Sequence, residues 1–337
     1  MKIGLIGAGR IGKLHGELIT YHVPEAEIKA VADIHINQAE QWAEKLKLSK
    51  SKLTTDHTAI LKDSEIEAVL ICSSTDTHSQ FIIEAAEAGK HIFCEKPIDF
   101  DINRIKAALK AVKAAGVKLQ IGFNRRFDHN FRKVRELVEA GKIGDVHMVK
   151  ITSRDPAPPP IAYVKVSGGI FLDMSIHDFD MARYLSGSEV EEVYAQGAVL
   201  IDPAIGDAGD LDTAVITLKF KNNAMGVIDN SRQAVYGYDQ RVEVFGSKGC
   251  VEVQNDVPNS SKLSTSDGVI SEKPLYFFLE RYQMSYVEEL KAFVDAVIND
   301  KEPQVTGNDG LQPVLIGLAA LKSLREKRAV KIEEVTG

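Results

Sequence analysis

The chain has 337 residues, of which 44% are hydrophobic and 26% are charged, and its formal net charge is −7. This length exceeds one ordinary core and predicts two domains that need no disulfides, while the acidic balance offers no basic stripe for nucleic acid. No apolar run reaches the roughly 20 residues that a membrane helix needs, and Met1 leads almost directly into a strand, so we expect no membrane partner, no signal peptide and a cytoplasmic location.

The chain opens on a short apolar run and a glycine-rich turn, Gly7-Ala8-Gly9-Arg10-Ile11-Gly12. A strand, a glycine turn and a helix start present backbone N–H groups and a helix dipole to a pyrophosphate. The next predicted strand, 28–32, ends at Asp33, whose carboxylate would accept hydrogen bonds from a ribose diol and repel a 2′-phosphate. We therefore predict an NAD site, with NAD preferred over NADP, that contains Gly7, Gly9, Arg10, Ile11, Gly12 and Asp33.

Strand-like and helical segments alternate over residues 1–123. The expected strands after the first cover 28–32, 68–72, 91–94 and 117–122, and the expected helices cover 36–46, 79–88 and 102–115. This alternation predicts an α/β Rossmann domain with a doubly wound parallel sheet. Ligands bind beyond the carboxyl ends of such strands, so we expect the loops at 73–75, 95–97 and 124–126 to meet at the cofactor.

The pattern changes in residues 124–337. The expected helices cover 131–140, 282–298 and 310–327, and the expected strands cover 146–152, 191–199, 213–220, 224–230, 240–245, 250–254 and 330–332. Strands joined by short turns predict a C-terminal α+β domain with a large, mainly antiparallel open sheet. Because such a sheet can pair face to face with another copy, we expect a homo-oligomer.

Two segments carry candidate catalytic groups. Asp173 and His177 are four residues apart, which puts them on one face if a helix starts here, and an acid there can hold the tautomer of the histidine. The alternative is that Asp173 only caps the helix and that His177 is structural. Lys96 follows a predicted strand and precedes a proline, which holds it out of helical conformation; the alternative is a solvated surface lysine.

Four motifs together resemble the glucose-fructose oxidoreductase/inositol dehydrogenase/rhizopine catabolism family. They are the glycine turn, Cys94-Glu95-Lys96-Pro97, Gly122-Phe123-Asn124-Arg125-Arg126-Phe127-Asp128 and Asp173-xxx-His177-Asp178. The resemblance covers essentially the whole chain. Within the family, the segments 153–156, 168–184 and 236–239 are most similar to bacterial myo-inositol 2-dehydrogenases.

The resemblance implies roles for individual residues. His177 is expected to be the general acid/base, Asp173 its partner and a substrate ligand, and Lys96 a donor to the reacting hydroxyl. The positions expected to face the cofactor are Ser73, Thr75, His78, Glu95 and Lys96, and those expected to line the polyol site are Lys96, Arg125, Asp155, Asp173, His177 and Tyr238. Relatives also suggest a cis peptide bond before Pro97 and a tetramer, and we expect no metal.

The expected activity is NAD-dependent oxidation of myo-inositol to 2-keto-myo-inositol. His177 would take the hydroxyl proton while the hydride leaves for the nicotinamide. One alternative is a dehydrogenase of the same fold that acts on scyllo-inositol or on another sugar or polyol. A second is an NAD-binding regulator without turnover, against which the joint presence of Lys96, Asp173 and His177 argues.

Overall fold

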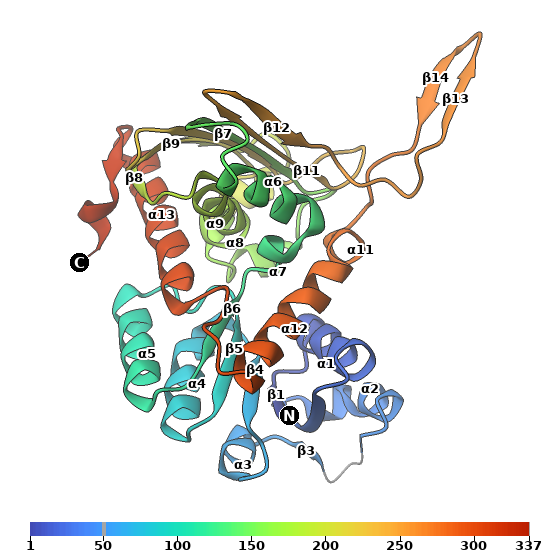
Figure 1. Ribbon diagram of the computed structural model, residues 1–337, viewed down its shortest axis with the longest axis vertical. Helices are drawn as coiled ribbons and strands as arrows, with labels where there is room; N and C mark the ends of the chain where they lie inside the picture. The colour runs from blue at the N-terminus through green and yellow to red at the C-terminus, as the bar shows by residue number, and fades with distance from the viewer. Residues whose placement is uncertain (49–51, 337) are drawn as a thin grey trace. The chain divides into compact units, whose positions relative to one another are not determined.

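The computed structural model describes residues 1–48 and 52–336 (Figure 1). The chain forms two compact units: 1–124 with 284–312, and 125–283 with 313–337. It therefore crosses between the units three times, whereas the expected domains divide it once, after residue 123. Within the described ranges, no helix combines the length and the apolar character that a bilayer span requires.

The first unit is built on a six-stranded parallel sheet in the order β3-β2-β1-β4-β5-β6. Its strands are β1 Lys2–Ile6, β2 Glu27–Ala32, β3 Leu53–Thr54, β4 Ala68–Ile71, β5 His91–Glu95 and β6 Leu119–Gly122. This strand order is that of the doubly wound dinucleotide-binding fold, and it confirms the predicted Rossmann domain. In such a sheet, ligands bind beyond the carboxyl ends of the strands.

Helices flank this sheet. They are α1 Arg10–His22, η1 Ile36–Gln38, α2 Glu40–Lys45, α3 His57–Lys62, α4 Thr75–Glu87, α5 Ile102–Ala115 and α12 Gln283–Ile298, of which α12 belongs to this unit from Met284 onward. The helix expected at 36–46 is divided into η1 and α2. Neither β3 nor α3 was predicted, because two and six residues are too few to show a period.

The second unit contains a seven-stranded sheet in the order β12-β11-β7-β10-β9-β8-β15. Its strands are β7 Val146–Arg154, β8 Val190–Ala198, β9 Thr213–Phe220, β10 Met225–Ser231, β11 Asp239–Gly246, β12 Gly249–Val253 and β15 Val330–Lys331. Among these strands β7 and β10 are parallel and the other neighbours are antiparallel, so the sheet is mainly antiparallel, as predicted. The parallel pair places Arg154 opposite Ser231, and both strands end at the same edge of the sheet.

Helices cover one face of this sheet, and a hairpin extends away from it (Figure 1). The helical segments are η3 Asn124–Phe127, α6 His129–Glu139, α7 Ile161–Val164, α8 Gly169–Asp173, α9 Ser175–Ser186, α10 Pro203–Asp207, α11 Phe278–Arg281, α13 Gly307–Glu326 and η4 Ile332–Val335. Of these, η3 belongs to this unit from Arg125 onward and α13 from Pro313 onward. The hairpin strands are β13 Lys262–Thr265 and β14 Gly268–Ser271. Its sequence alternates too weakly for the strands to have been predicted.

Alternation along the strands separates a buried face from an outer face. On β7 the side chains of Val149, Ile151 and Ser153 are buried, whereas Lys150 is exposed. Successive side chains of a strand point to opposite faces, so Asp155, the residue after β7, belongs to the same face as Ser153, where it is partly exposed. Asp155 also extends the ladder, because its N–H donates to the carbonyl of Ser231 at 2.9 Å.

Candidate active site

The glycine turn after β1 has the shape that the prediction requires. Gly7 has a φ of +95°, and a Cβ there would lie 2.5 Å from the backbone nitrogen of Ser73. A Cβ on Gly12 would lie 1.9 Å from the carbonyl oxygen of Gly7, so both positions need glycine. Around Gly9 a Cβ would meet nothing within 4 Å, and the first turn of α1 holds no acid. This open helix start fits a pyrophosphate.

Asp33 lies at the end of β2 and contacts the glycine turn. Its Oδ2 accepts from the backbone N–H of Ala8 at 2.6 Å, and its Oδ1 accepts from the N–H of His35 at 2.7 Å. The side chain is only partly buried. One carboxylate therefore holds the turn and remains accessible for the ribose contact that the sequence predicts.

The loop after β4 is joined to the loop after β5 through His78. The Nδ1 atom of His78 lies 2.8 Å from the carbonyl oxygen of Pro97, and Nε2 lies 3.1 Å from that of Ser73. His78 is 2% exposed, and burial lowers the pKa of its ring. The buried ring of His78 therefore links the two loops, because each of its nitrogens contacts a backbone carbonyl of one loop. Ser73 contacts Thr77 through their hydroxyls at 2.7 Å, and Thr75 begins α4.

Glu95 is the last residue of β5 and Lys96 follows it, and both are half-buried. The Lys96–Pro97 peptide bond is cis, as the resemblance suggested. The Glu95 carboxylate faces inward, because its Oε1 lies 2.6 Å from Nε2 of His15 on α1. The first unit therefore brings together the glycine turn, Asp33 and the loops after β4 and β5 at the carboxyl edge of its sheet.

In the second unit, Asp173 and His177 belong to two successive helices. Asp173 is the last residue of α8, Met174 lies between the helices, and Ser175 begins α9. The sequence put both residues on one face on the condition that a single helix starts here, and the two separate helices do not meet that condition. The alternative, in which Asp173 caps the helix, was wrong, because Met174 occupies the N-cap of α9. His177 lies in the first turn of α9 and is partly exposed.

Buried polar contacts anchor the start of α9 around His177. The Ser175 hydroxyl lies 2.5 Å from Oδ1 of Asn230, whose amide nitrogen donates to Asp178 at 2.8 Å. The other oxygen of Asp178 accepts from Arg125 at 2.6 Å. Burial raises the pKa of Asp178, and the charge of Arg125 opposes this effect. Arg125 lies 3.4 Å from the hydroxyl of Tyr238 at the sheet edge, and both are buried.

One buried arginine joins the two carboxylates that the sequence assigned to substrate. Arg232, the residue after β10, lies with Nη2 3.0 Å from Asp173 and with Nη1 3.5 Å from Asp155. Arg232 is 3% exposed. The second oxygen of Asp173 accepts from the hydroxyl of Tyr163 at 2.7 Å. Burial raises the pKa of Asp155 to about 6, and Arg232 opposes this shift.

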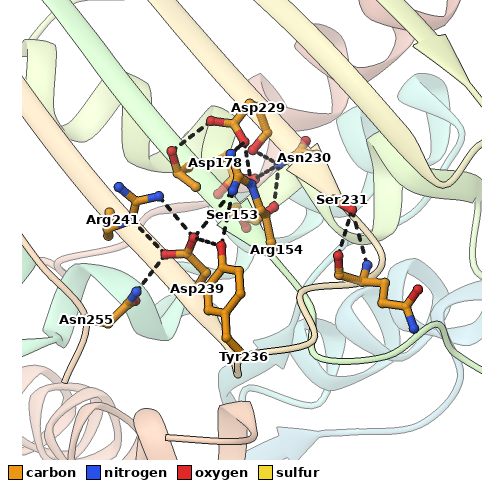
Figure 2. A network of polar contacts seen from close by, with 12 residues as sticks. Ser153, Arg154, Asp178, Asp229, Asn230, Ser231, Tyr236, Asp239, Arg241 and Asn255 are labelled. Atoms are coloured by element: carbon orange, nitrogen blue, oxygen red, sulfur yellow. Dashed lines mark hydrogen bonds and ion pairs between the residues drawn. The ribbon is translucent and has the colours of Figure 1, made fainter. Parts of the chain in front are cut away.

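A second polar network lies on the outer face of the sheet, at the same ends of β7 and β10 and at the start of β11 (Figure 2). Arg154 donates to Asp229 at 2.7 Å and to the hydroxyl of Tyr236 at 3.1 Å. Tyr236 in turn donates to Asp239 at 2.6 Å, and Arg241 donates to Asp239 at 2.7 Å. Figure 2 also labels Ser153, Asp178 and Asn230, whose side chains are buried. Because successive side chains of a strand point to opposite faces of the sheet, the adjacent residues Arg154 and Asp155 belong to different networks.

Sequence reasoning missed Arg232, Tyr163 and Asn230. An arginine directly after the polar end of a strand, in Asp229-Asn230-Ser231-Arg232, was the available signal for two of them. It could be interpreted only with the knowledge that β10 lies parallel to β7, because that pairing brings Arg232 to the same edge as Asp155. The sequence offered no comparable signal for Tyr163, which follows the proline-rich loop.

Comparisons with known proteins agree with this architecture. Residues 1–123 match a family model described as "Oxidoreductase family, NAD-binding Rossmann fold". Residues 131–252 match the model of the GFO/IDH/MocA C-terminal domain.

Full-length relatives match over almost the whole chain. The chain is 55% identical to the uncharacterized oxidoreductase YrbE of Bacillus subtilis, over 98% of this chain and 96% of that protein. It is 52% identical to the myo-inositol 2-dehydrogenase of Thermotoga maritima, over 100% of both chains. Its fold matches the crystal structure of scyllo-inositol dehydrogenase from Lactobacillus casei with bound NAD(H) and scyllo-inositol, with a TM-score of 0.92, 32% identity and 99% coverage of each chain. The chain therefore belongs to the GFO/IDH/MocA family of oxidoreductases, and its first unit is an NAD-binding Rossmann domain.

Proposed function

We propose that this protein is an NAD-dependent inositol 2-dehydrogenase that oxidises myo-inositol to 2-keto-myo-inositol. The observation that carries the proposal is the pair of carboxylates Asp155 and Asp173, which Arg232 holds beside the helix that bears His177. A ring with several hydroxyl groups needs several fixed acceptors, and two such carboxylates meet that need. The full-length match to a protein named myo-inositol 2-dehydrogenase supports the same substrate.

The first unit would hold the cofactor. The N–H groups after Gly9 would bind the pyrophosphate, and Asp33 would accept from the ribose hydroxyls. Ser73, in the loop after β4, and Thr75, the first residue of α4, would also contact the cofactor. NAD, when bound, supplies a nicotinamide ring that accepts a hydride from the substrate carbon.

The proton chemistry falls to three side chains. His177 would act as general base and accept the hydroxyl proton at a ring nitrogen. Asp173 would accept from the substrate and hold the histidine in its working orientation. Lys96 would donate to the reacting oxygen and stabilise the negative charge that develops on it. Release of the ketone follows loss of the hydride, and the reverse reaction uses His177 as the acid.

The other residues predicted to bind substrate would form hydrogen bonds with the remaining hydroxyl groups of the ring. Asp155 is a quarter exposed at its side chain and would accept from one of them. Arg125 and Tyr238 are buried and would define the floor of the polyol site rather than its mouth. Tyr163 is 44% exposed and holds Asp173, so it would influence substrate entry on the proline-rich side.

The test is NADH production from a panel of substrates with both cofactors. We expect myo-inositol with NAD to give the highest kcat/KM, and scyllo-inositol, glucose and other polyols to give lower values. If the protein prefers scyllo-inositol or a sugar, the proposed substrate is wrong but the proposed reaction class stands. Tight NAD binding without turnover on any polyol would contradict the enzyme assignment and favour a regulator.

We further propose that the protein is a homotetramer. Large apolar side chains are exposed on the outer face of the second unit's sheet: Val215, Met225 and Phe245 are 49%, 54% and 48% exposed. Met225 and Phe245 are both directly paired with Met148 of β7, so they form one row across three strands. Contact between such faces would bury this row. Light scattering of the purified protein measures the order of the oligomer directly.

A further inference from the structure

Three ionisable side chains lie together inside the first unit, and two of them have no role in the proposed reaction. They are His15 of α1, Glu95 at the end of β5 and Glu289 of α12. One ligand atom from each residue lies within 4.8 Å of those of the other two. His15 and Glu289 are 0% exposed. Glu95 immediately precedes Lys96, the proposed donor to the reacting oxygen.

The surroundings of this cluster are apolar and aromatic. The His15 ring meets Phe93 and Tyr286 edge to face, with centroid distances of 5.1 and 5.7 Å. Other titratable groups lie nearby. The thiols of Cys72 and Cys94 are buried, and burial raises the pKa of each, which keeps them uncharged. The phenol of Tyr286 packs against His15, and the buried ring of His78 is close enough for the charge of Glu95 to act on it. The charge that acts on Glu289 comes from Glu95 and has the same sign.

Ionising both of two carboxyl groups this close together is unfavourable when one of them, Glu289, is fully buried. Burial first, and then the neighbouring Glu95, raise the pKa of Glu289 well above its ordinary value. Glu95 is the carboxyl group that has a hydrogen-bond partner, because its Oε1 lies 2.6 Å from Nε2 of His15. Among the described residues, neither carboxyl oxygen of Glu289 nor Nδ1 of His15 has a hydrogen-bond partner.

We propose that His15 and Glu289 are positioning residues: Glu289 stays protonated, Glu95 is the single anion of the buried cluster, and His15 fixes it so that Lys96 has one orientation. The role assigned to Lys96 rests on the proposed function. Packing adds to the restraint, because a Cβ on Gly122 of β6 would lie only 3.1 Å from the Glu95 carboxyl group. Glu95 is thus enclosed on the β6 side and held by a hydrogen bond on the α1 side.

The same three side chains also form a ligand set that zinc or manganese could use. The distance between His15 Nε2 and Glu95 Oε1 favours a direct hydrogen bond between these atoms over a shared metal ion. At 2.6 Å it is a hydrogen-bond distance, whereas two ligand atoms at about 2.0–2.2 Å from one tetrahedral zinc ion are farther apart than this. A bound metal is therefore an outcome that the experiment must be able to detect.

The first experiment measures the protonation state without any substrate. The infrared spectrum of the full-length protein at neutral pH should contain the C=O band of a buried protonated carboxyl group, and the Glu289→Gln variant should lose it. Glu288→Gln is the matched control: Glu288 is the adjacent residue of α12, partly exposed and ion-paired with Lys291 at 3.1 Å. It should leave the band unchanged. If the Glu289→Gln variant loses no such band, the proposal is overturned. A stoichiometric metal in the purified protein, whose removal disorders the site, also overturns it.

The second experiment tests the positioning role through NADH binding and turnover. Glu289→Gln keeps one donor and one acceptor, so its kcat should stay within about twofold of the parent value. Glu289→Leu keeps the volume but no polar group, and its kcat should fall about tenfold or more, because small displacements of catalytic groups are costly, with NADH affinity little changed. Equal losses in both variants, or none in Glu289→Leu, overturn the positioning role. If the parent protein oxidises no polyol, the proposed function fails, but the infrared result still decides the protonation of Glu289.

Discussion

The carboxylate of Asp33 accepts a hydrogen bond from the backbone N–H of Ala8 at 2.6 Å, so the acid that would select the cofactor also holds the glycine turn. Asp33→Asn keeps an acceptor for Ala8 but removes the negative charge. We expect the ratio of kcat/KM with NAD to that with NADP to fall about 10- to 100-fold, because a charge-assisted contact to the ribose is lost and the repulsion of a 2′-phosphate disappears.

The control for this variant is Asp63→Asn, which removes a carboxylate of the same unit that pairs with Lys29 at 2.7 Å. Its cofactor ratio should match that of the parent protein. An unchanged ratio in Asp33→Asn would count against the ribose contact.

His177→Gln should remove the proposed general base while keeping a polar side chain of similar size. We expect kcat to fall about 10²- to 10⁴-fold and the affinity for NAD to stay nearly constant, because His177 lies outside the Rossmann unit. Steady-state turnover and NADH fluorescence titration measure the two quantities. His147→Gln is the control, since His147 is exposed on β7 and its ring packs against that of Phe245 at a centroid distance of 6.0 Å. Near-normal turnover in His177→Gln would remove this residue from the mechanism.

The elements that the sequence predicted best are those with local signals. Helix α5 was expected at 102–115 and has those bounds. Asp101 caps it by accepting from the N–H groups of Asn103 and Arg104, and Gly116 ends it with a φ of +67°. These signals all lie within one turn of the helix ends, so they could be recognised without a partner in space.

The features that could not be predicted depend on contacts between distant parts of the chain. Helix α12 belongs to the first unit, where the amide of Gln120 donates to the carbonyl of Glu289 across 169 residues of sequence. No local pattern encodes such a contact. The carboxylate pair of the candidate site has the same origin: Asp155 and Asp173 were predicted separately, and Arg232, which joins them, comes from a third segment.

Arg232→Met should leave Asp155 and Asp173 as adjacent negative charges without their shared partner. Because Arg232 is buried, we expect the free energy of unfolding to fall on the order of 3 kcal/mol and the KM for the polyol to rise about tenfold or more. Arg154→Met is the matched control, one side-chain position away from Asp155 but on the outer face, where a third of the arginine side chain is exposed. There the expected loss is below about 1 kcal/mol, and KM should not change. Equal effects on KM would show that the two faces of the sheet do not differ in function.

Polyol binding should depend on pH through Asp155. Burial raises the pKa of this carboxyl to about 6, and the negative charge of Asp173 adds to the shift while Arg232 opposes it. The ionised form is therefore almost complete at pH 8 and is largely lost at pH 5. An ionised carboxylate makes the stronger, charge-assisted hydrogen bond to a hydroxyl group, so affinity should be higher at pH 8 and fall severalfold as the pH drops through about 6.

The measurement is inositol binding to the protein loaded with NADH, followed by fluorescence, in the His177→Gln background, because a histidine titrates in the same range. When Asp155→Asn is added to this background, the inositol affinity at pH 8 should fall to about the affinity that the His177→Gln protein has at pH 5. The affinity of the double variant should then be the same at pH 5 and pH 8. Asn keeps the size of the side chain but cannot ionise, so the comparison isolates the charge from the shape. A pH dependence that survives in Asp155→Asn would assign the titration to another group, and Asp173, the other carboxylate that Arg232 holds, would be the next residue to replace.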